Sequence, residues 1–212
     1  MKSIFFDNEA VYPSKIVCIG RNYAAHIKEL KNEVPEEPVF FLKPNSSISG
    51  EIHSGKIDEI HYEGEITFLL IAGKIRGVGF GLDLTKRGIQ SKLKAKGLPW
   101  ERAKAFDNSA VFSPFVSYEG NISDLSLELY INGVLKQQGG YGLMLHKPEA
   151  IIREAGQIFS FEDCDLLMTG TPAGVGPVLR GDGFTGKIME KGNVVVEHSW
   201  VADEPSNVLR KN

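Results

Sequence analysis

The chain has little cysteine and no long hydrophobic run. Its 212 residues include two cysteines, Cys18 and Cys164, which form neither a CxxC pair nor the spacing of a zinc site. We expect two reduced thiols, as in a cytoplasmic protein. No apolar run approaches the length of a membrane span, and charged residues interrupt the N-terminus too early for a signal peptide. These absences predict a soluble, cytoplasmic protein that has no membrane partner.

No segment carries an excess of charge of one sign. The 24 basic and 27 acidic residues give a net charge of -3 and a pI near 6.0, and they are interspersed, so nucleic acid is not expected as a partner. Phosphate-binding motifs are also missing, because no Gly-Lys-Ser/Thr follows the glycines of residues 169–177, and residues 77–81 lack the dinucleotide spacing. No Pro/Gly/Ser-rich linker divides the chain, which predicts a single domain over residues 1–212.

Strand patterns outnumber helical ones. Apolar runs rich in branched or aromatic residues predict strands at 15–19, 38–42, 61–72, 77–82, 125–131, 165–168 and 194–201. Asn132-Gly133 predicts a type I′ hairpin turn after one of them. Helical spacing is confined to residues 23–31, 86–96 and 148–159. Thr85 is the expected cap of the second helix, and Ile151, Ile152, Ala155 and Ile158 are expected to face inward in the third. The predicted fold class is α+β, mainly β.

Carboxylates give the strongest functional signal. In the segment Ile60-His61-Tyr62-Glu63-Gly64-Glu65-Ile66, a strand period of two places Glu63 and Glu65 on one face. Their Cβ atoms would then lie roughly 6.6 Å apart. Asp83 follows the predicted strand 77–82. The apolar run 68–72 indicates burial, and buried like charges need a cation or a proton between them. The pattern predicts a site for one hard divalent cation. An exposed strand with acidic outward positions is the alternative.

Further polar side chains recur at helical spacing. His26 and Glu29 stand at i and i+3, so the carboxylate can orient the imidazole as a general base, although an ordinary surface pair has the same spacing. Arg87 and Gln90 repeat that spacing after Asp83 and can hold a carboxylate, unless they belong to a solvated basic helix. Lys104 lies between small residues and a Phe, where partial burial would make it an electrophilic anchor. The loop 169–177 leaves backbone amides and the hydroxyl of Thr171 free to meet an anion.

Several motifs occur together in one order along most of the chain. They are Ile16 to His26, Phe41-Leu42-Lys43-Pro44, His61 to Glu65, Leu82 to Arg87, Gly97-Leu98-Pro99-Trp100 with Lys104 to Asp107, and Thr169 to Pro177. In these motifs the chain resembles the fumarylacetoacetate hydrolase family, and within it the acylpyruvase and oxaloacetate-processing branch. The resemblance implies a mixed β-sandwich roll with short helices, usually a homodimer.

The resemblance also implies roles for individual residues. Mg²⁺ or Mn²⁺ would be held by Glu63, Glu65 and Asp83. The catalytic groups would be His26, Glu29 and Lys104, with His26 and Glu29 on a lid helix. The groups around the substrate's carboxylate and keto oxygens would be Arg21, Arg87, Gln90 and Thr171. The chain departs from the family at Gly88, where Asp is usual, and in a short stretch between Ile66 and Gly77.

The implied activity is metal-dependent cleavage of a carbon–carbon bond in small 2-keto acids. Hydrolysis of an acylpyruvate to pyruvate and a carboxylic acid is the first expectation, with His26 activating water. Decarboxylation of oxaloacetate and its keto–enol tautomerisation are alternatives that need no attacking water. A further alternative is a non-catalytic β-rich module that binds a structural ion such as Ca²⁺, which would not require His26, Glu29 or Lys104.

Overall fold

The structure is a computed structural model that describes residues 1–55 and 57–203. The domain predicted over residues 1–212 therefore includes positions 56 and 204–212, which lie outside the described residues. Helices in the described part are short: α1 (Ala24–Glu29), α2 (Arg87–Ala95), α3 (Glu101–Lys104), α4 (Pro148–Ala155), and the 3-10 turns η1 (Asn45–Ser47), η2 (Ile122–Asp124) and η3 (Tyr141–Leu143). None of them is both long and apolar enough to cross a membrane.

The largest sheet has eight strands and is mixed. Its order is β4-β3-β14-β7-β8-β10-β5, with β11 also paired to β8. Parallel pairing joins β3 to β14 and β5 to β10, and the other pairs are antiparallel. The strands are β3 (Lys15–Gly20), β4 (Val39–Pro44), β5 (Ile48–Ser49), β7 (Gly64–Ile71), β8 (Lys74–Asp83), β10 (Ala110–Phe112), β11 (Val116–Ser117) and β14 (Leu166–Met168).

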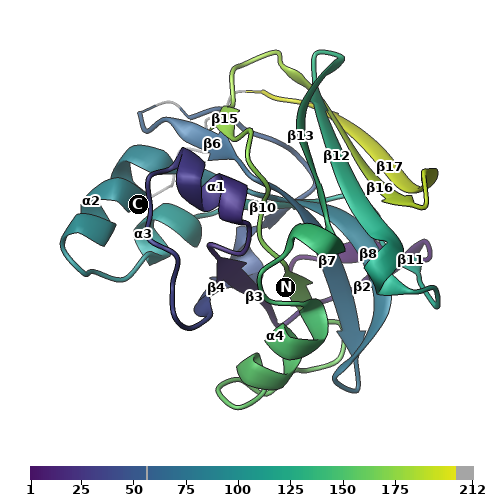
Figure 1. The fold of residues 1–212 in the computed structure, drawn as a ribbon. Coiled ribbons are helices and arrows are strands. Elements are labelled where there is room, and N and C mark those ends of the chain that lie inside the picture. Colours follow the sequence, from purple (N-terminus) through teal and green to yellow (C-terminus); the bar gives the residue numbers. More distant parts are fainter. Residues whose placement is uncertain (56, 204–212) are drawn as a thin grey trace.

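A four-stranded antiparallel sheet packs on β7 and β8 (Figure 1). Its order is β13-β12-β16-β17, with β12 (Leu125–Ile131), β13 (Val134–Gly140), β16 (Gly183–Glu190) and β17 (Asn193–Val201). Asn132 and Gly133 both have positive φ, 51° and 77°, which confirms the predicted hairpin turn. Two small sheets complete the fold: β15-β6-β9, from β6 (Ile60–Tyr62), β9 (Thr85–Lys86) and β15 (Gly176–Pro177), and β1-β2, from β1 (Ile4–Phe6) and β2 (Glu9–Val11).

Alternation along the strands of the large sheet separates two apolar clusters. In β3, Val17 and Ile19 belong to the cluster shared with the four-stranded sheet, whereas Ile16 and Cys18 belong to a smaller cluster. Because successive side chains of a strand point to opposite faces, the smaller cluster lies on the face of the large sheet away from the sandwich core. The mainly β, α+β fold with short helices is therefore confirmed.

Three local predictions differ from the structure. The expected strand 61–72 is divided at Glu63 into β6 and β7, which belong to different sheets. Thr85 does not cap α2, because it lies in β9 and its hydroxyl donates to the carbonyl of Asp83 at 3.1 Å. Ile158 does not face inward, because α4 ends at Ala155 and leaves Ile158 exposed. The first two differences arise where strand pairing overrides a local pattern.

Asp165 anchors β14 to β3 through a buried carboxylate. It accepts hydrogen bonds from the backbone N–H groups of Ser14, Lys15 and Glu162 and pairs with the Lys15 ammonium. Burial opposes its charge, but these donors lower the pKa of Asp165. We expect Asp165→Asn to lower the free energy of unfolding by about 2–3 kcal/mol at pH 7, because buried donors lose their partner.

Urea unfolding measures this change. The loss should shrink as the pH falls from the unfolded aspartate value, about 4, through the lower folded pKa. Lys191→Gln, which removes an exposed ion pair with Asp124, is the control and should change the midpoint little. A loss for Asp165→Asn that does not depend on pH would contradict the electrostatic origin.

Candidate active site

Three carboxylates converge where β6, β7 and β8 meet. The chain turns at Glu63 between β6 and β7, and the N–H of Asp83 at the end of β8 donates to the carbonyl of Glu63 at 2.9 Å. Glu65 follows on β7, opposite Gly81. One carboxylate oxygen of each lies within 4.8 Å of the others, and the three residues are at most 5% exposed. The predicted carboxylate triad, Glu63, Glu65 and Asp83, is therefore assembled as a buried cluster.

Gly64 separates this cluster from the sandwich core. A Cβ at Gly64 would lie 2.9 Å from the Phe80 ring and 3.1 Å from Oε1 of Gln137. The space that the missing side chain leaves is used by Gln137, a buried residue of β13 whose Oε1 accepts from the Gly64 N–H at 2.8 Å. Since Gly64 and Glu65 point to opposite faces, the carboxylate triad lies on the face of the large sheet away from the four-stranded sheet.

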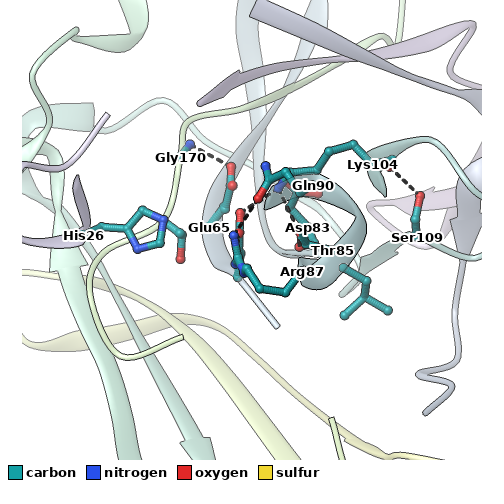
Figure 2. A network of polar contacts seen from close by, with 12 residues as sticks. His26, Glu65, Asp83, Thr85, Arg87, Gln90, Lys104, Ser109 and Gly170 are labelled. Atoms are coloured by element: carbon teal, nitrogen blue, oxygen red, sulfur yellow. Dashed lines mark hydrogen bonds and ion pairs between the residues drawn. The ribbon is translucent and has the colours of Figure 1, made fainter. Parts of the chain in front are cut away.

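Basic side chains surround the carboxylate triad. Lys104, at the end of α3, places its ammonium 2.8 Å from Glu63 and 2.6 Å from Asp83. Lys43, a fully buried residue of β4, lies 2.8 Å from the other oxygen of Asp83. Arg87, at the start of α2, pairs with the remaining oxygen of Glu63. In the view of Figure 2, Lys104 lies to the right of Glu65 and Arg87.

These charges shift the pKa values of the site in different directions. Burial alone would raise the pKa of Glu63, but Lys104 and Arg87 lower it well below its usual range. Burial opposes the charge of Lys104, yet Asp83 and Glu63 raise its pKa. Glu65 receives one N–H, from Gly170 at 2.7 Å, and its pKa is raised well above its usual range by burial and by the charges of Asp83 and Glu63.

The donor set fits a hard divalent cation. Three buried carboxylate oxygens within 4.8 Å of one another are ligands of the kind that Mg²⁺ and Mn²⁺ prefer. The raised pKa of Glu65 means that a cation or a proton must compensate its charge. The cluster can therefore hold one divalent ion.

His26 lies on the other side of the carboxylates, on α1 (Figure 2). Its Nδ1 is 3.2 Å from Glu29, whose second oxygen accepts the N–H of Gly174 at 2.9 Å. Burial lowers the pKa of His26 despite the nearby charges of Glu63 and Glu29. The predicted His26–Glu29 pair is thus formed, with an imidazole that is uncharged at neutral pH and held in one orientation.

The carboxylate triad, His26 and Lys104 line a cavity of about 20 Å³. The other expected substrate groups, Arg21, Arg87, Gln90 and Thr171, line the same cavity. Arg21 has a positive φ, 57°. The amide oxygen of Gln90 accepts a hydrogen bond from Arg87 at 2.7 Å. This leaves the amide nitrogen of Gln90 for another acceptor. The Thr171 hydroxyl is not free, because it donates to the Gly64 carbonyl at 2.9 Å. The loop 169–177 does bind an anion, because the Gly170 N–H donates to the carboxylate of Glu65.

Three residues near the carboxylates were given no role from the sequence. Lys43 pairs with Asp83 from β4, Gln137 accepts the Gly64 N–H from β13, and Lys94 lines the cavity from α2. Lys43 could have been found from the sequence, because a charged residue inside the apolar strand 39–44 needs a buried partner. Gln137 and Lys94 stand in polar segments where the sequence offers no such contrast.

Gly88 stands where the resemblance led us to expect an Asp. No heavy atom lies within 4 Å of where its Cβ would be, and the first turn of α2 has neither an acidic residue nor a side-chain cap. We expect Gly88→Asp to raise the free energy of unfolding by about 1 kcal/mol, because Asp favours the positive helix terminus and glycine weakens a helix. Urea unfolding measures this, and Gly88→Asn should gain less. Equal gains would contradict the helix-dipole contribution.

Comparison with known proteins agrees with this fold. The family model described as "Fumarylacetoacetate (FAA) hydrolase C-terminal" matches residues 15–202. The chain therefore belongs to the fumarylacetoacetate hydrolase family of enzymes, as its motifs indicated.

Three individual proteins are similar to this chain over most of its length. The chain is 40% identical to oxaloacetate tautomerase YcgM of Escherichia coli, over 82% of this chain and 88% of that one. It is 39% identical to a mitochondrial oxaloacetate decarboxylase of Dictyostelium discoideum, over 81% and 89%. Fumarylpyruvate hydrolase from Pseudomonas aeruginosa, solved in complex with Mn²⁺ and pyruvate, has a TM-score of 0.86 at 27% identity and covers 96% of each chain.

Proposed function

We propose that this chain is a divalent-metal-dependent enzyme of small 2-keto acids whose main reaction is the keto–enol tautomerisation of oxaloacetate. One observation carries the proposal: an uncharged, oriented His26 and a charged Lys104 line one cavity together with the carboxylate triad. A base and a cation placed around one substrate are what enolisation requires. The relatives named for oxaloacetate support this substrate.

The comparisons change the order of the functions expected from the sequence. Acylpyruvate hydrolysis came first there, but the solved fumarylpyruvate hydrolase is 27% identical to this chain, whereas relatives at about 40% identity are named for oxaloacetate. The alternative, tautomerisation or decarboxylation of oxaloacetate, is therefore better supported.

Glu63, Glu65 and Asp83 would hold Mg²⁺ or Mn²⁺, which when bound would withdraw electrons from the keto oxygen of the substrate. In the keto-to-enol direction, His26 removes a proton from C3, and Glu29 stabilises the imidazolium that forms. The Lys104 ammonium neutralises the negative charge that develops on O2. A proton from solvent added to O2 completes the enol, and the imidazolium releases the proton taken from C3 to solvent. The reverse direction returns the proton from His26 to C3.

Decarboxylation of oxaloacetate is a second candidate, favoured by the relative named for it. It gives the enolate of pyruvate, so Lys104 would neutralise the same developing charge, while His26 would not be needed to remove a proton. The two reactions differ in whether carbon dioxide and pyruvate appear.

The test follows both reactions with one purified sample of the full chain. Loss of the enol absorbance of oxaloacetate reports tautomerisation, and a coupled lactate dehydrogenase assay reports pyruvate, each with Mg²⁺, Mn²⁺ or EDTA. We expect metal-dependent loss of enol that is much faster than pyruvate release. Pyruvate release at the same rate would favour the decarboxylase, and cleavage of acetylpyruvate alone would overturn the proposal.

A further inference from the structure

The candidate site extends outward along α2. Arg87, Gln90 and Lys94 are spaced at i, i+3 and i+7, so they share one face of the helix, and all three line the cavity that contains the carboxylate triad. A second cavity of about 200 Å³ adjoins it and shares these three residues. The path from the carboxylate triad past Lys94 therefore leads from the smaller cavity into the larger one.

The basic side chains along this path have different partners. Arg87 and Lys104 are paired with carboxylates of the triad. Within residues 1–55 and 57–203, the ammonium of Lys94 has no hydrogen bond or ion pair, and it lies 5.0 Å from the centroid of the Trp100 ring. Arg21 has no carboxylate partner in that part of the chain. Its guanidinium donates to the Glu33 carbonyl at 3.4 Å, and its buried Nε has no partner there.

Lys94 and Arg21 are close enough to affect each other. Burial, followed by the charge of Arg21, lowers the pKa of Lys94 to about 8. Lys94 and Arg21 line one cavity, are partly buried and have no carboxylate paired directly with them among the described residues, so they repel each other although the charge of Glu63 partly offsets this. An anion bound between them would remove the repulsion and supply both missing partners.

We propose that Lys94, together with Arg21, binds a second carboxylate of the substrate and so makes the site selective for dicarboxylic 2-keto acids. This inference rests on the proposed function, because it takes the keto acid end of the substrate to lie at the carboxylate triad. Oxaloacetate has a second carboxylate at C4, whereas acetylpyruvate has a neutral methyl ketone at its distal end. A cationic subsite at Lys94 distinguishes the two.

The kinetic test compares oxaloacetate with its 4-methyl ester, which keeps the keto acid end and removes the distal charge. We expect Lys94→Gln to raise KM for oxaloacetate about 10- to 100-fold, the effect of losing a hydrogen bond to a charged group, with kcat changed by less than about threefold. KM for the ester should stay the same. Lys94→Arg should keep most of the preference for oxaloacetate, because the positive charge remains.

Lys92→Gln is the matched control, because Lys92 is exposed on the same helix and outside both cavities. It should leave both KM values unchanged. An equal rise in KM for oxaloacetate and for the ester in Lys94→Gln would show a general structural role and overturn the subsite. An unchanged preference would also overturn it.

A binding measurement separates this inference from the proposed function. Calorimetry with Mg²⁺ and either L-malate or its 4-methyl ester uses ligands that do not tautomerise. Tighter binding of malate by the natural chain, lost in Lys94→Gln, would support the subsite even if oxaloacetate were not turned over. Equal binding of the two ligands by the natural chain would overturn the subsite even if tautomerisation were observed.

Discussion

Glu65→Gln should abolish metal-dependent turnover of oxaloacetate, with a loss of at least about 10³-fold. The substitution removes one of three anionic ligands while an amide oxygen can still accept the Gly170 N–H. Transition-state charge stabilisation by a metal amounts to several kcal/mol, which corresponds to this factor. The enol absorbance assay with Mg²⁺ or Mn²⁺ measures the loss. Activity that persists and still responds to EDTA would refute the three-carboxylate site.

The same variant should be more stable than the natural chain when no metal is present. Burial and the charges of Asp83 and Glu63 raise the pKa of Glu65. The protonated carboxyl therefore contributes to stability below the pKa of an unfolded glutamate, about 4.3, and this contribution is lost as pH rises through the folded pKa. A neutral Gln avoids that loss. Thermal unfolding at pH 7 should give a higher Tm for Glu65→Gln in EDTA, and Mg²⁺ should raise Tm only in the natural chain.

His26→Gln should lower kcat for tautomerisation about 10²- to 10⁴-fold, which is the usual contribution of a general base. KM and the increase of Tm by Mg²⁺ should change little, because His26 is not part of the carboxylate triad. Glu29→Gln should cause a smaller loss, since it orients the imidazole through one contact of 3.2 Å. An unchanged kcat in His26→Gln would assign the proton transfer to another group.

The pH profile gives an independent check on His26. Its pKa is lowered by burial, so it stays uncharged to a lower pH than an ordinary histidine. The rate limited by proton removal should therefore persist below about pH 6.5 and fall as pH drops through the lowered pKa. This acidic limb should disappear in His26→Gln.

Much of the candidate site could be predicted because its residues carry local signals. Glu63, Glu65 and Asp83 interrupt apolar strands, where a charge needs a reason, and His26 with Glu29 share a helical face. The prediction of one continuous strand through Glu63 was nevertheless wrong. Strand β6 pairs with β15 and β9, whereas β7 pairs with β8 and β14. A period of two does not reveal which partner strand each half will find.

Other features depend on contacts that no local rule contains. Strand β16 was missed because its inward positions include Gly186, where a Cβ would lie 2.4 Å from the Phe80 ring. Its lack of a side chain hides the apolar alternation. The Thr171 hydroxyl was expected to be free, but its partner is a carbonyl 107 positions away along the chain.

The order in which the site's charges meet has a consequence for how the chain folds. Glu65 and Asp83 lie in the hairpin of β7 and β8, which can pair outward from its turn, and Glu63 directly precedes this hairpin. Lys43 and Lys104 arrive on other elements, β4 and α3. Local contacts form before distant ones, so the carboxylates would meet before these lysines arrive. Divalent cations should therefore speed refolding of the natural chain at neutral pH, and Glu65→Gln should reduce that acceleration.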